Sequence, residues 1–170
     1  ALQVSAPVLL MIHLTGGHWQ RHCLGYRLRP VDVVTAAALV VAGYFAGGGT
    51  ASLAGAFQSN APTRILDTRL ASDVTAGLPV RHGQPIDLQV TGAHGGVTIP
   101  ADASAVVMNV TVANPTKAGF VTVYPKGTTK PDASNLNFGT GQAAIANLVT
   151  VKVGTGGGVS LSVSTDTDPT

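Results

Sequence analysis

A regular alternation of apolar and polar residues organises the middle of this chain. Four apolar residues recur at every second position, and they are Val106, Met108, Val110 and Val112. This period of two is typical of a half-buried strand. Turn-forming residues at 114–119 (NPTKAG) follow, and then comes a β-branched and aromatic run at 120–124. We therefore expect a β-hairpin with a longer loop over residues 106–124.

A second alternation fills the end of the chain. Apolar residues alternate with polar ones at 145–153 and again at 159–163, on either side of the glycine-rich stretch 154–158. The pattern predicts a second hairpin. Shorter strands are expected at 62–69, 86–90 and 134–138, with loops at 77–84, 91–100 and 125–131. Many short strands separated by turns favour an antiparallel β-sandwich, jelly-roll or Greek-key-like.

The composition supports an all-β fold and limits the partners. Hydrophobic residues make up 45% of the 170 positions and charged residues only 11%, and no residue is Glu. Abundant Val and Thr without Glu favour strands over helices. The net charge of +2 gives no reason to expect a nucleic-acid partner.

The first part of the chain allows two interpretations. Residues 31–45 are apolar apart from Asp32 and Thr35, and a Gly-rich stretch follows. They form either the core of a signal-like segment with a cleavage site before Phe57, or a retained buried strand, which we favour. We accordingly divide the chain into an N-terminal extension, 1–56, and a β-sandwich module, 57–170.

Four motifs occur in a recognisable order. They are 62–69 (PTRILDTR), 106–125 (VVMNVTVANPTKAGFVTVYP), 134–138 (SNLNF) and 146–153 (ANLVTVKV). Together they resemble a β-rich module that recurs in secreted and surface proteins of actinobacteria, over about residues 57–163. The closing strand typical of that family is missing after residue 163, and residues 40–45 (VVAGYF) resemble it. Residues 31–45 are then either the end of a preceding repeat or a permuted strand that completes the sheet.

The best candidates for a ligand site are Arg64, Asp67, Arg69 and Tyr124. The two arginines could bind an anionic sugar or a phosphate through their planar donor groups. We favour the alternative in which Asp67 pairs with the arginines and with backbone amides to fix a strand-to-loop corner. Tyr124 could stack on a sugar ring or pack across strands.

Other constellations give no site. His18, His22 and Cys23 lack further zinc ligands at a suitable spacing. Residues 139–144 match GxGxxA, but a strand is expected directly afterwards, so a tight turn is favoured over a dinucleotide site. Asp166 and Asp168 lie in what we expect to be a solvated tail. We therefore expect no catalytic residues, no metal and no cofactor.

The resemblance implies a location outside the cell and a binding or structural role. We expect a non-enzymatic extracellular module that contacts cell-envelope polysaccharide, with no membrane insertion. One alternative is a structural subunit of a surface layer, a filament, or a phage capsid or tail, which would bind copies of itself as a homo-oligomer. A third is an accessory domain of a cell-wall hydrolase.

Overall fold

The computed structural model describes residues 33–47 and 55–166. They form strands joined by turns and one short 3₁₀ segment, without an α-helix, so the predicted all-β fold is confirmed. No helix among the described residues is long and apolar enough to cross a membrane. The strands are β1 (Val33–Phe45), β2 (Phe57–Asp67), β3 (Val80–Arg81), β4 (Ile86–Gln89), β5 (Gly92–His94), β6 (Val97–Ile99), β7 (Ala105–Pro115), β8 (Gly119–Pro125), β9 (Leu136–Phe138), β10 (Ile145–Lys152) and β11 (Gly158–Thr165).

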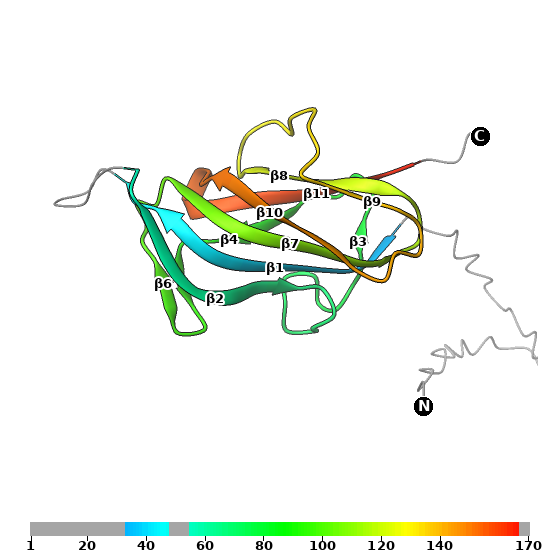
Figure 1. Ribbon diagram of the computed structural model, residues 1–170, viewed down its shortest axis with the longest axis horizontal. Coiled ribbons are helices and arrows are strands. Elements are labelled where there is room, and N and C mark those ends of the chain that lie inside the picture. The colour runs from blue at the N-terminus through cyan, green and yellow to red at the C-terminus, as the bar shows by residue number, and fades with distance from the viewer. Residues whose placement is uncertain (1–32, 48–54, 167–170) are drawn as a thin grey trace, which may run out of the picture.

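Two antiparallel sheets pack against each other as a sandwich, as predicted. Sheet A has the order β10-β7-β1-β2, and β3 also pairs with β1. Sheet B has the order β4-β11-β8-β9, and β5 and β6 form a small separate hairpin. Figure 1 shows the strands of sheet A side by side, from β10 and β7 down to β1 and β2.

The apolar run near the start of the chain forms β1, an interior strand of sheet A. It pairs with β2 on one edge and with β7 on the other. The strand interpretation is thus confirmed over Val33–Phe45, while residues 31 and 32 lie outside the described part. The domain boundary at residue 56 stays a prediction. In the structure, β1 pairs on both sides with strands of the 57–170 part.

The two predicted hairpins are wrong in their pairing, although their strands are placed correctly. β7 lies in sheet A and β8 in sheet B, and β10 and β11 are separated in the same way. Each connection therefore crosses between the sheets. The physical reason is that the edges of these strands pair with segments far away in the sequence, such as β1 with β7. Alternation shows which side faces the core, but it does not show which strand occupies the neighbouring edge.

Two predicted loops contain further strands. Residues 91–100 include the hairpin β5–β6, whose turn lies at Gly95 and Gly96, both with positive φ. Residues 77–84 include β3, which continues sheet A beyond the end of β2. These three strands are only two or three residues long, too short for an alternation to be seen.

The core lies between the sheets, where the alternations predicted it. Val106, Met108, Val110 and Val112 of β7 are fully buried. In β10 the inward Val149 and Val151 are buried, whereas Leu148 on the opposite side is 63% exposed. β11 differs, because its outward Ser160 and Ser162 are buried as well as its valines.

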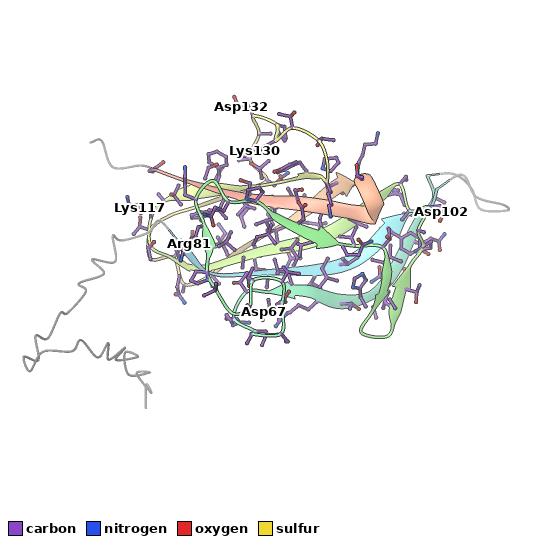
Figure 2. The ribbon with its side chains drawn as sticks, turned by 180° about the vertical axis from the view of Figure 1, so that it is seen from behind. Asp67, Arg81, Asp102, Lys117, Lys130 and Asp132 are labelled. Carbon is purple, nitrogen blue, oxygen red and sulfur yellow. The ribbon has the colours of Figure 1, made fainter. Side chains whose placement is uncertain are left out.

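The outer side of sheet B is covered by residues 126–135, which follow β8. The Thr122 hydroxyl donates to the Ala133 carbonyl at 2.6 Å, and Lys130 Nζ donates to Ser164 Oγ at 2.7 Å. Asn135 Oδ1 accepts from the Val123 N–H at 2.7 Å. Figure 2 shows Lys130 and Asp132 on this loop, on the side of the sandwich away from Asp67.

Candidate functional site

Asp67, the last residue of β2, is the centre of the predicted ion-pair corner. Its carboxylate accepts hydrogen bonds from Arg64 Nη1 at 2.9 Å and from Arg69 Nε and Nη2 at 2.8 and 2.6 Å. The Arg69 backbone N–H also donates to Asp67 Oδ1, at 3.1 Å. The Asp67 side chain is 3% exposed, while those of Arg64 and Arg69 are 53% and 60% exposed. The structure therefore brings these three predicted residues together.

The arginines hold Asp67 in its ionised form. Hydrogen bonding from Arg69 lowers the pKa of Asp67 from 3.8 to about 2, and the charges of Arg69 and Arg64 act in the same direction. Burial acts against them, because it disfavours the charged carboxylate. The same pairing raises the pKa of Arg69. A carboxylate with so low a pKa is poorly suited to general acid–base catalysis near neutral pH.

The corner also fixes the segment that follows it, loop 68–79. The buried Thr68 donates its N–H to the Ala37 carbonyl at 3.0 Å, and its Oγ1 accepts from the Ala37 N–H at 2.9 Å. Asp73 Oδ2 accepts from the Asp67 N–H at 2.6 Å. Side chains that bond nearby backbone groups in this way fix turns. The predicted Asp–Arg corner is thus confirmed, whereas a ligand on its arginines stays a prediction.

Loop 68–79 forms part of a groove of about 420 Å³. Apolar side chains make up much of the lining, and they are Val74, Leu78, Pro79, Val80, Pro85 and Ile86. Arg81, Gln84 and Thr75 add polar groups to the same lining. The Thr75 hydroxyl is buried and has no hydrogen-bond partner among the described residues. The groove is open to solvent, since Val74 and Leu78 in its lining are 63% and 59% exposed.

Tyr124 does not belong to this corner. It lies on β8 in sheet B, pairs with Ser160 of β11, and is only 7% exposed. Its ring is therefore not available as an open stacking surface, and the structure favours the packing role.

The remaining predicted constellations add no site. The segment with His18, His22 and Cys23, and likewise Asp168, lies outside the described residues. Residues 139–144 form a turn in which Gly141 has positive φ and the Gly139 N–H donates to Gln142 Oε1 at 3.1 Å, and β10 begins at Ile145. The tight-turn interpretation is confirmed. The described part of the chain contains no group of three or more His, Cys, Asp or Glu that could hold a metal ion.

Reasoning from the sequence missed the groove. Its polar residues Arg81 and Gln84 fall in a stretch expected to be loop, and Thr75 carries no motif. The only available signal was the clustering of Leu70, Val74 and Leu78, three large apolar residues in a turn-rich segment. All three are exposed.

Comparisons of this chain with protein-family models, with curated proteins and with solved structures give no match.

Proposed function

We propose that this chain is a non-enzymatic module that works at the outside of a cell and binds a polysaccharide of an actinobacterial-type envelope. The observation that carries the proposal is the groove beside the Asp67 corner. It combines aliphatic side chains, which can pack on the apolar side of a sugar ring, with hydrogen-bonding groups on Arg81 and Gln84. The ion-pair corner supports it, because it holds loop 68–79 in place before a ligand arrives.

The charges of the site favour a neutral glycan over a polyanion. Arg64 and Arg69 are offset by Asp67 within hydrogen-bonding distance and by Asp73, which contacts the Asp67 backbone. Arg81 then remains as the positive group of the groove lining. Because no aromatic ring among the described residues lines the groove, the contacts would be aliphatic packing and hydrogen bonds, which suits modest affinity for a repeating polymer.

Co-sedimentation with insoluble envelope polysaccharide tests the proposal. Wild-type protein should pellet with the polysaccharide, and Arg81→Ala with Gln84→Ala should bind at least about tenfold more weakly, the loss expected when two hydrogen bonds to a ligand are removed. Lys152→Ala is the matched control, because it removes an exposed positive charge from sheet A, away from the groove. Equal binding by the groove variant and the control would overturn the assignment of the groove.

A second candidate function is a structural subunit of an ordered assembly. The specific observation in its favour lies on the outer side of sheet A, where Phe57 and Leu148 are 49% and 63% exposed.

A further inference from the structure

The outer side of sheet A has an unusual composition for a surface that faces water. Residues paired across antiparallel strands point to the same side, so the register defines this surface. Leu148, Asn109, Val40 and Arg64 form one row across β10, β7, β1 and β2. Two rows further along, Lys152, Ala105, Phe45 and Phe57 form another. We call the outward side chains between Ala146 and Lys152 of β10, with their row partners, the open face.

The middle of the open face contains no charge, and aliphatic side chains lie there beside the uncharged polar Asn109 and Thr150. Val40 and Val107 lie there on the two interior strands and are partly exposed, and Leu148 beside them is 63% exposed. Antiparallel sheets with one side in water normally alternate apolar inside with polar outside. The charged groups lie at the ends of the rows, where Lys152 is on one edge strand and Arg64 on the other.

At one end the open face is shaped by an aromatic pair. The rings of Phe45 and Phe57 have centroids 5.4 Å apart at an interplanar angle of 57°. A Cβ on Gly43 would lie 2.4 Å from Phe57 Cζ, so the glycine leaves the space that this ring occupies. Phe57 nevertheless remains 49% exposed. The Phe57 ring thus packs against the sheet at Gly43 and projects little from its outer side.

We propose that the open face packs against the open face of a second copy of this chain, giving a face-to-face dimer. Two observations select a copy as the occupant. The uncharged centre can meet itself in a two-fold contact without repulsion, because its charges lie at the row ends. The area also suits a transient dimer. Four strands about 4.8 Å apart and about seven residues long give about 450 Å² per copy, or about 900 Å² in total, within the range of weak associations.

Concentration-dependent light scattering of the full chain tests this inference. The mass should rise from monomer toward dimer between about 10 µM and about 1 mM, the range expected for an interface of this size. Leu148→Lys places a charge in the face and should weaken association at least about tenfold. Thr129→Lys is the matched control, because Thr129 is exposed in segment 126–135 on the outer side of sheet B, and it should leave association unchanged.

Methyl NMR of the unmodified chain gives a readout that does not depend on any variant folding. On dilution, the methyl signals of Val40, Val107 and Leu148 should shift together, while those of Leu88 on β4 of sheet B stay constant. A chain that remains monomeric at about 1 mM would overturn the proposal. Association that responds to Thr129→Lys and not to Leu148→Lys would overturn it too. Methyl shifts on the open face that depend on added polysaccharide and not on protein concentration would also overturn the proposal. In that case the groove proposal would still be tested by Arg81→Ala with Gln84→Ala.

Discussion

On the outer side of sheet B, hydroxyl side chains are buried and hydrogen-bonded, whereas on the outer side of sheet A the side chains of Leu148 and Phe57 are exposed to water. Ser160 and Thr122 are 4% and 0% exposed, and each hydroxyl donates a hydrogen bond of 2.6 Å, to Asp87 Oδ1 and to the Ala133 carbonyl. Leu148 on the other sheet is 63% exposed. The polar groups on the outer side of sheet B are therefore the buried ones. The loop that covers this side needs polar partners for its own backbone groups, and the Thr122 hydroxyl supplies one to the Ala133 carbonyl.

The Asp67 corner is the part of the outer side of sheet A that resembles sheet B, since a polar group there is buried and satisfied. Asp67 pairs across the sheet with Ala38, in the row next to that of Val40. The two sheets thus share one feature. On each outer side, a buried polar group is covered by a loop or by long side chains that hydrogen-bond to it. The exposed part of the outer side of sheet A has no such cover among the described residues.

The largest expected effect comes from breaking the covered corner. Asp67→Asn should lower the free energy of unfolding by about 3 kcal/mol, because it removes the charge from a buried carboxylate that accepts four hydrogen bonds. Urea unfolding at neutral pH measures this loss. Asp102→Asn, at an exposed position, should change the free energy by less than about 0.5 kcal/mol. A loss below about 1 kcal/mol for Asp67→Asn would show that the corner is not a stabilising cover.

Acid should weaken the same corner in the wild-type protein. The pKa of Asp67 is lowered in the folded state from 3.8 to about 2. A lowered folded-state pKa contributes stability that is complete above the unfolded-state value and is lost as the pH falls through the folded-state value. As the pH falls from about 5 to about 2, protonation of Asp67 should therefore lower the free energy of unfolding by about 1 to 2 kcal/mol. This range is smaller than the full value of the pKa shift, because both arginines are half exposed. The free energy of unfolding, measured across this pH range, should fall less steeply with decreasing pH in Asp67→Asn than in wild type.

A matched pair of substitutions compares the two outer sides directly. Thr122→Val on sheet B should lower the free energy of unfolding by about 1 to 2 kcal/mol, since the Ala133 carbonyl loses its donor. Thr150→Val on sheet A, at an exposed position of β10, should change it by less than about 0.5 kcal/mol. Thermal or urea unfolding of both variants supplies the comparison. Equal losses would contradict the view that only the outer side of sheet B is held by its cover.

The smallest effect is expected on the open face itself. Leu148→Ser in dilute solution should alter the free energy of unfolding of the monomer by less than about 0.5 kcal/mol, because little apolar area is lost from a side chain that is already exposed. Its neighbour Val149, 4% exposed, is the contrast, and Val149→Ser should cost about 2 kcal/mol or more. A large loss for Leu148→Ser at low protein concentration would mean that this side is packed within one chain.

The strands and their inward sides could be predicted from the sequence, while the pairing could not. Alternation in β7, β10 and β11 located the core residues, because burial on one side of a strand imposes a period of two. The same alternation is compatible with a hairpin and with a crossing between sheets, so β7 and β8 were wrongly paired. The Asp67 corner was predictable since its partners lie within three residues of it. The groove was not, because its residues come from turns whose shape depends on β3 pairing with β1.

The position of β1 has a consequence for the order in which this protein can assemble. Val40 pairs with Asn109, so about 70 more residues must be synthesised after β1 before its second edge is occupied. During that interval β1 can pair with β2 alone, and the unpaired backbone groups of its other edge can pair with another nascent chain. We therefore expect slow folding and a dependence on chaperones during synthesis to arise from β1 more than from any other strand described.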